Sequence, residues 1–66
     1  MVKFLKAVTI EVTSDLIDDV PISTEETFNE DETCDADIIS DTDGVAELQF
    51  GDGNVAFVNS KYVKEI

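Results

Sequence analysis

Several residue types that support catalysis or metal binding are missing from this sequence or scarce in it. The 66 residues include no histidine, arginine or tryptophan, and only one cysteine and one proline. A single cysteine cannot form an internal disulfide, whereas small secreted domains usually carry several. Cys34 also lacks a histidine to activate it and a second cysteine to share a metal. We therefore expect Cys34 to be a small core residue, and we expect no cofactor and no metal.

Long hydrophobic runs are missing as well. No stretch approaches the ~20 apolar residues that a membrane-spanning helix requires. Residues 1–6 contain two lysines but no apolar run after them, so they do not resemble a secretory signal. Together with the single cysteine, these absences predict one domain over residues 1–66 in the cytoplasm, without a membrane partner.

Basic residues are few, and acidic residues dominate the chain. Sixteen Asp and Glu face four lysines, which gives a formal net charge of −12. Neutralising phosphates requires Lys and Arg, so the charge argues against direct binding to nucleic acid or to an anionic membrane. From Glu11 to Asp52 there are fifteen acidic residues and no basic one, and all four lysines lie near the termini. We expect the partner to be a basic protein.

Hydrophobic residues are present mainly in alternation with polar ones, which is typical of strands with one buried face. The alternation runs through residues 2–12, 34–38 and 45–50, and further short strands are expected at 55–58 and 63–66. Asp41–Gly44 and Gly51–Asn54 have the composition of tight turns between them. Strands at this spacing predict an all-β fold, a small barrel or sandwich.

Residues 13–31 do not alternate, and they predict a long acidic loop. Pro21 lies in its middle, where it argues against a central strand. A one-turn helix over residues 24–28 is an alternative within this loop, with Ser23 as its N-cap and acidic residues in its first turn.

The order of elements in the C-terminal half resembles that of SH3 domains. Ser60, Tyr62 and Val63 match the motif that closes this family, Glu26-Thr27-Phe28 resembles its approach to the second strand, and residues 41–44 resemble its n-Src loop. The resemblance implies a five-stranded SH3-like barrel in which residues 13–31 are the RT loop and the first and last strands pair. The four lysines would then gather at one end of the molecule.

The aromatic residues with which SH3 domains bind proline-rich peptides are largely missing. Val45 and Ala46 stand where the family has its tryptophan pair, Asn59 replaces a proline, and only Tyr62 of the platform remains. The resemblance therefore does not predict binding of a polyproline helix, which docks on grooves made by those aromatics.

Two chemical hypotheses fail on the residue types. An EF-hand loop with its glycine at Gly44 would need acidic residues where Ile39 and Phe50 stand. The paired carboxylates Glu25-Glu26 and Asp18-Asp19 lie in exposed loops, whereas general acid–base catalysis requires an apolar cleft that separates their pKa values. We therefore predict that the chain is not an enzyme.

What remains is an acidic, non-enzymatic interaction module that binds a basic protein. Two alternatives stay open: a nucleic-acid mimic that inhibits a DNA- or RNA-binding protein, and a structural or assembly subunit, such as a phage or prophage accessory protein. Binding is expected to depend on the acidic loop and on the surviving aromatic. The candidate partner-binding residues are Asp15, Asp18, Asp19, Glu25, Glu26 and Tyr62.

Overall fold

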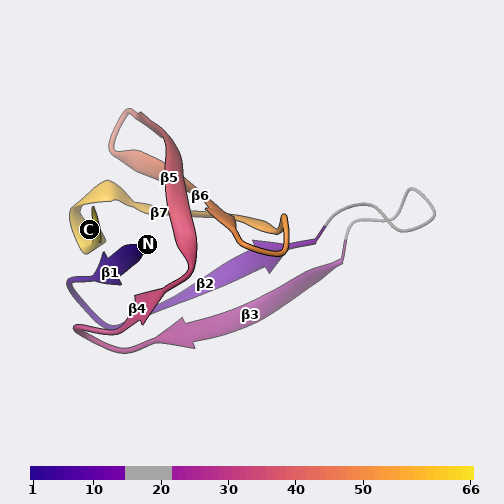
Figure 1. The fold of residues 1–66 in the computed structure, drawn as a ribbon, viewed down its shortest axis with the longest axis horizontal. Helices are drawn as coiled ribbons and strands as arrows, with labels where there is room; N and C mark the ends of the chain where they lie inside the picture. Colours follow the sequence, from indigo (N-terminus) through magenta and orange to yellow (C-terminus); the bar gives the residue numbers. More distant parts are fainter. Residues whose placement is uncertain (15–21) are drawn as a thin grey trace.

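The chain forms two antiparallel β-sheets whose inner faces share one hydrophobic core (Figure 1). This is a computed structural model, and it describes residues 1–14 and 22–66. Within these residues there are eight strands and a one-turn 3₁₀-helix, η1 (Ser60–Tyr62). The strands are β1 (Val2–Phe4), β2 (Val8–Thr13), β3 (Ser23–Phe28), β4 (Thr33–Cys34), β5 (Ala36–Thr42), β6 (Val45–Phe50), β7 (Val55–Asn59) and β8 (Val63–Glu65).

The expected all-β class is confirmed, but the expected five-stranded barrel is not closed. One sheet has the strand order β4-β1-β8 and the other the order β3-β2-β7-β6-β5. The first and last strands pair as predicted, with Lys3 directly opposite Lys64. Two of the predicted strands are split because the chain passes from one sheet to the other, and each split adds a strand to the count.

The two splits lie where the chain bends between the sheets. Residues 5–7 separate β1 from β2, at the point where Lys6 interrupts the alternation. Asp35 separates β4 from β5, and its carbonyl accepts a hydrogen bond from the Gly51 amide at 3.0 Å. A Cβ at Gly51 would lie 2.6 Å from Asp35 Oδ2, so glycine permits this close approach. Strands that change sheets through bends make the corners of a β-sandwich.

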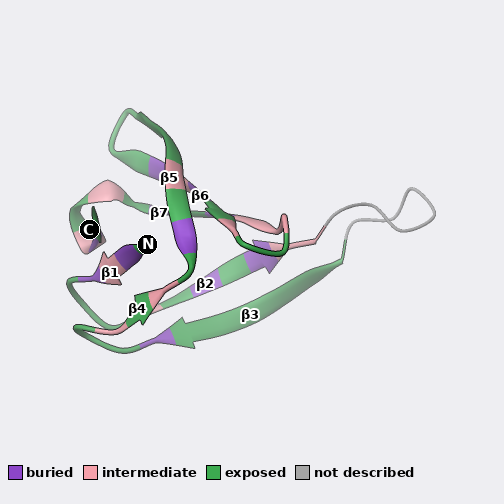
Figure 2. Ribbon diagram, viewed as in Figure 1, coloured by how far each residue is buried: buried purple, intermediate pink, exposed green. Residues whose placement is uncertain are grey.

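Residues 23–28 form a strand, which corrects the predicted helix over residues 24–28 and this part of the loop predicted over residues 13–31. β3 pairs with β2 over six residues, from Val8 opposite Phe28 to Thr13 opposite Ser23. Only Phe28 in β3 is buried, and Figure 2 shows the strand exposed along almost its whole length. The alternation was invisible in the sequence because β3 is an edge strand with little to bury.

Turns occur at both predicted hairpins of the β5–β6–β7 meander, but the first is shorter than the predicted Asp41–Gly44, because Asp41 and Thr42 belong to β5. Asp43 and Gly44 connect β5 to β6 with φ values of 55° and 81°. Two consecutive residues with positive φ are typical of a type I′ turn, and Asp-Gly is a favoured pair for it. Between β6 and β7, the Phe50 amide donates to the Asn54 carbonyl at 2.8 Å.

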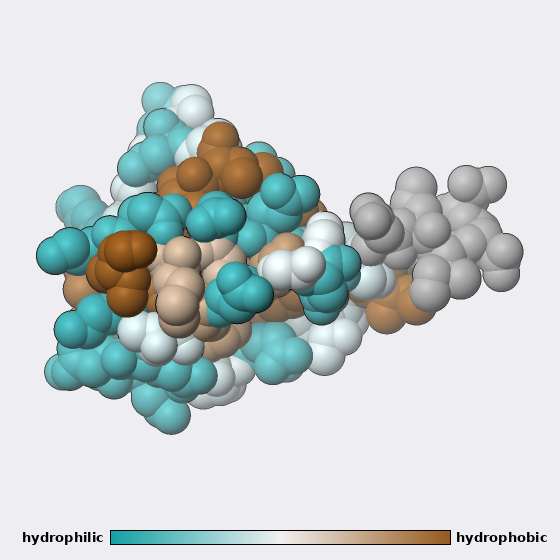
Figure 3. Space-filling model, viewed as in Figure 1, coloured by the Kyte–Doolittle hydropathy of each residue, from teal (hydrophilic) through white to brown (hydrophobic). Residues whose placement is uncertain are grey.

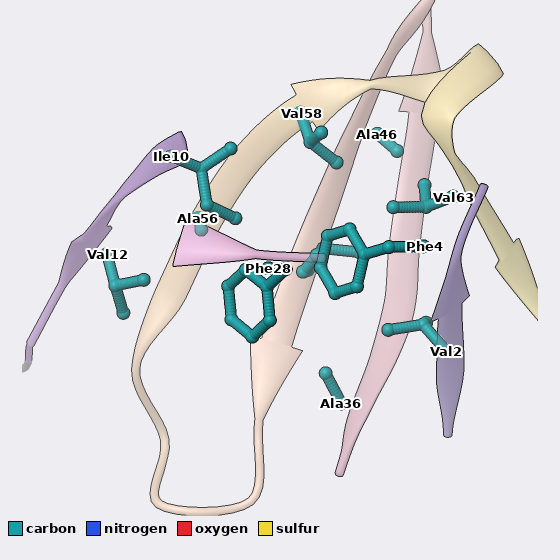
Figure 4. Packing of buried hydrophobic residues seen from close by; sticks show 11 residues of the cluster. Val2, Phe4, Ile10, Val12, Phe28, Ala36, Ala46, Ala56, Val58 and Val63 are labelled. Atoms are coloured by element: carbon teal, nitrogen blue, oxygen red, sulfur yellow. The ribbon is translucent and has the colours of Figure 1, made fainter. Parts of the chain in front are cut away.

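The core is small and comes from both sheets, as Figure 4 shows. Phe4 of β1 stacks on Phe28 of β3, with ring centroids 4.3 Å apart. Phe50 continues the stack at 6.2 Å from Phe28. The inward side chains predicted from the alternation are buried or packed against the core. The buried set is Val2, Phe4, Ile10, Val12, Phe28, Ala36, Ala46, Leu48, Ala56, Val58 and Val63.

No helix in the part of the chain that the structure describes is long and apolar enough to cross a membrane.

Candidate protein-interaction surface

The β2–β3 ribbon, residues 8–13 paired with 23–28, carries the described part of the predicted acidic site. Figure 1 shows the two strands running together away from both chain termini. On the outward face of the ribbon, Glu11 lies directly opposite Glu25. Directly opposite residues of an antiparallel pair project from the same face, with Cβ atoms about 5 Å apart. The ribbon therefore holds two carboxylates side by side in solvent.

Hydroxyl pairs lie on either side of these two carboxylates. Thr9 Oγ1 and Thr27 Oγ1 are 3.0 Å apart, and Thr13 Oγ1 and Ser23 Oγ are 3.3 Å apart. Cross-strand hydroxyl pairs contribute about 0.2–1 kcal/mol each, and a like-charge pair opposes folding by a similar amount. The hydroxyl pairs thus offset part of the repulsion between Glu11 and Glu25, which the six-residue β2–β3 pairing brings together.

Glu26 points to the other face of the ribbon. It lies opposite Ile10, whose side chain is buried, yet Glu26 itself is exposed because β3 is the edge of its sheet. Charged residues that point inward on an edge strand hinder pairing with another strand. Glu25 and Glu26 therefore do not act on the same face, whereas Glu25 and Glu11 do. The predicted site residues Asp15, Asp18 and Asp19 lie outside the described residues.

Tyr62 lies among the lysines at the β1–β8 end, where it packs against the core and also contacts a cation. Lys6 Nζ lies 5.1 Å from the centroid of its ring, within the range of a cation–π interaction. The Tyr62 carbonyl accepts a hydrogen bond from the Leu5 amide at 2.8 Å. The structure does not group Tyr62 with Glu25 and Glu26 in one contact.

The end of the molecule that carries Lys3, Lys6, Lys61 and Lys64, here called the lysine end, is where the ion pairs of the described residues lie. Lys3 Nζ lies 3.5 Å from Asp31 Oδ1. The N-terminal amine lies 3.2 Å from Glu65 Oε2 and 3.5 Å from Asp37 Oδ1. Within the described residues, every ion pair uses either Lys3 or the N-terminal amine.

Glu65 ties the last strand to β5. Its Oε1 accepts a hydrogen bond from the Ile38 amide at 3.0 Å. This backbone bond, and then the bond from the N-terminal amine, holds the pKa of Glu65 below its ordinary value. The same contact with Glu65 raises the pKa of the amine.

Cys34 is half-buried and packs against the core, which confirms the prediction that it is a small core residue. Burial is the main cause that raises the pKa of its thiol, and the neighbouring charge of Glu32 adds to it. A raised pKa lowers the thiolate fraction and therefore the nucleophilicity at neutral pH.

Phe57 is a surface residue that the sequence analysis did not single out. The residue is 61% exposed, the highest value among the large hydrophobic residues in the described chain. Its neighbours in β7, Ala56 and Val58, are buried, so Phe57 projects from the outer face. The signal was present in the sequence, because the alternation that buries Ala56 and Val58 turns Phe57 outward. Figure 3 shows further hydrophobic surface over β5 and β6, bordered by hydrophilic side chains.

Among residues 1–14 and 22–66, no cluster of three or more Asp, Glu, Cys or His side chains could hold a metal ion, and no pocket is present. Comparison with models of protein families, with curated proteins and with solved structures found no match to this chain.

Proposed function

We propose that this chain is a small, non-enzymatic interaction module with SH3-like connectivity, and that its β2–β3 ribbon binds a basic protein. The observation that carries the proposal is the Glu11–Glu25 pair, which the β2–β3 register holds together on an exposed face between two hydroxyl pairs. A like-charge pair opposes folding, and a cationic group placed between the two carboxylates relieves that repulsion on binding.

The SH3-like part of the proposal is supported by the order of elements. β1 pairs with β8, β2 and β3 form a ribbon that follows β1, and β5, β6 and β7 form a meander. The 3₁₀-helix η1 lies directly before the last strand, at the position of the Ser-Lys-Tyr segment that resembles the closing motif of SH3 domains. The ribbon then corresponds to the RT loop of that family.

The charge distribution supports a basic partner and a cytoplasmic location. With a net charge of −12, the protein attracts cationic surfaces over about one Debye length, ~8 Å at physiological salt. The single cysteine is in keeping with a reducing compartment.

Titration calorimetry with a defined basic probe tests the proposal. The probe is a short acetylated and amidated peptide in which arginine alternates with threonine. The double variant E11Q/E25Q should lower its affinity about tenfold at low salt, because two carboxylates lose their charge. D41N/D43N is the matched control: it removes an equal number of negative charges, from the end of β5 and the turn that follows it, and should lower affinity only about twofold through the general field.

Equal losses in the two double variants would refute the ribbon as the binding site. A second arm of the experiment is a competition: a nucleic-acid-binding protein replaces the peptide, and duplex DNA is added to see whether it displaces that protein from the chain. A partner that DNA displaces would favour the nucleic-acid mimic, and a partner that resists both DNA and high salt would favour an assembly subunit.

A further inference from the structure

The outer face of the five-stranded sheet has an aromatic residue at its centre and carboxylates on both sides of it. In the β6–β7 register, Phe57 lies directly opposite Glu47. On its other side, β7 pairs with β2 through Val12 opposite Ala56, so the next residue along each strand is Glu11 on β2 and Phe57 on β7. Glu11 in turn lies opposite Glu25.

These residues project from one face. Val12, Ala46, Leu48 and Ala56 are buried on the inner face, so their neighbours in the strands project outward. In line with Phe57, the outward residues form a row in which Ser40 of β5 lies opposite Glu47 of β6, and Glu47 lies opposite Phe57 of β7. The row continues one residue beyond the last β2–β7 pair, with Glu11 of β2 opposite Glu25 of β3. Ser40 Oγ bonds Glu47 Oε1 at 3.3 Å, which anchors one end of the row.

The flanking rows carry less charge. In one of them, Val45 lies between Thr42 and Asn59, which are uncharged. In the other, Val55 lies between Gln49 and Thr13. The coincidence of an exposed ring and adjacent carboxylates is therefore specific to the row of Phe57.

We propose that this face docks a basic protein segment by placing an arginine side chain over the Phe57 ring, between Glu47 and Glu11. A guanidinium group stacks on an aromatic face and donates paired hydrogen bonds to a carboxylate, and a lysine ammonium does this less well. The inference rests on the proposed function and names the group of the partner that is recognised. A second copy of the chain is a poor occupant, because it would bring the same carboxylates against each other at a net charge of −12 per molecule.

The test is the affinity of the arginine–threonine peptide and of the same peptide with lysine in place of arginine. F57L should lower the affinity for the arginine peptide about fivefold, and the affinity for the lysine peptide by a smaller factor. F57Y keeps an aromatic face and should retain the affinity. V45A is the matched control, because it shortens an exposed side chain on the same face in a row without carboxylates, and it should change affinity less than about twofold.

An NMR titration of ¹⁵N-labelled protein locates the contact. The amides of Glu11, Glu47 and Phe57 should show the largest shifts on addition of the arginine peptide. Shifts confined to the edge of β3 or to the lysine end would overturn the proposal. A monomer–dimer equilibrium that F57L abolishes would also overturn the proposal, because the group bound at the Phe57 face would then belong to a second copy of the chain.

The two proposals fail in different ways. If E11Q/E25Q lowers the affinity and F57L does not, the ribbon binds a basic partner without the aromatic, and the inference about Phe57 is wrong. If neither variant lowers the affinity beyond its control, the proposed function fails as well.

Discussion

The lysine end and the β2–β3 ribbon differ in how their charged side chains are paired. At the lysine end, Lys3 lies opposite a like charge, Lys64, but Lys3 forms an ion pair with Asp31. Nearby, Lys6 lies over the ring of Tyr62. In the ribbon, Glu11 faces Glu25 between uncharged hydroxyl pairs. The lysine end thus contains charge contacts that support the fold, whereas the ribbon contains a repulsive pair that the rest of the fold must hold in place.

The structural support for both regions comes from the same small core. Leu48 is fully buried at the centre of β6, and the core joins β1 and β8 to the ribbon through Phe4 and Phe28. The repulsion in the ribbon is tolerated only because this core and the strand pairing outweigh it. Under the proposed function, the ribbon is therefore the region where a basic partner relieves the most repulsion.

The largest expected effect tests whether the two regions share one core. Leu48→Ala should lower the free energy of unfolding by about 3 kcal/mol, because it leaves a cavity in a thin core. Chemical denaturation monitored by circular dichroism measures this. Val45 on the same strand is half-exposed, so the control variant Val45→Ala should change the free energy of unfolding by less than about 0.5 kcal/mol. If Leu48→Ala unfolds the ribbon and leaves the β1–β8 pair folded, the two regions are independent.

The next effect is the response of stability to salt. Raising NaCl from about 20 mM to about 300 mM should stabilise the unliganded protein, because it screens the repulsion among sixteen acidic residues. The midpoint of denaturation by urea, which is uncharged, measures the shift. E11Q/E25Q should respond less than D41N/D43N. A loss of stability with salt would mean that the attractive contacts of the lysine end dominate.

A smaller effect is expected from the cation over Tyr62. Lys6→Gln should lower stability by about 0.5 kcal/mol, since it removes an exposed cation–π contact. Lys61→Gln removes the same charge from an exposed site on η1 and is the control in the same urea titration. Equal losses would show that only net charge matters at the lysine end, and that the Lys6–Tyr62 contact contributes nothing.

The smallest effect concerns Glu65 and acid pH. Its folded-state pKa lies below the ordinary value of 4.5, so Glu65 stabilises the fold above that pH and loses this contribution as the pH falls through the lower folded value. Glu65→Gln removes the titrating group and should flatten the decline of stability between about pH 5 and pH 3. Denaturation midpoints across that range measure the slope. An unchanged slope would show that the bond to the Ile38 amide does not depend on the charge.

The sequence predicted those elements in which one face of a strand is buried. The alternation of β6 and of the start of β5, and turns near Asp43-Gly44 and Gly51–Asn54, could be read from it. The pairing of the terminal strands was expected only from the resemblance to SH3 domains. β3 could not be read from the sequence, because its side chains are nearly all exposed and its register is set by β2. Its acidic residues after Ser23 resembled a capped helix, although Thr24 and Thr27 also suit a strand.

The sequence predicted acidic residues in the ribbon, but not which of them share a face. Treated as loop residues, Glu25 and Glu26 formed a pair, but neighbours in a strand point to opposite faces. The residue that shares a face with Glu25 is Glu11, fourteen positions earlier in the sequence, and only the strand register brings them together. Phe57 was missed because an exposed aromatic acquires meaning only from its cross-strand neighbours, here Glu47 and the adjacent Glu11.

A double-mutant cycle on Glu11 and Glu25 tests the central claim most directly. The free energy of unfolding is measured for the wild type, E11Q, E25Q and E11Q/E25Q at low salt. We predict that either single variant stabilises the protein and that the pair is coupled unfavourably by about 0.3–1 kcal/mol, a coupling that disappears at high salt or with bound arginine peptide. A coupling of zero, or a favourable one, would contradict the claim that the fold holds these carboxylates together against their repulsion.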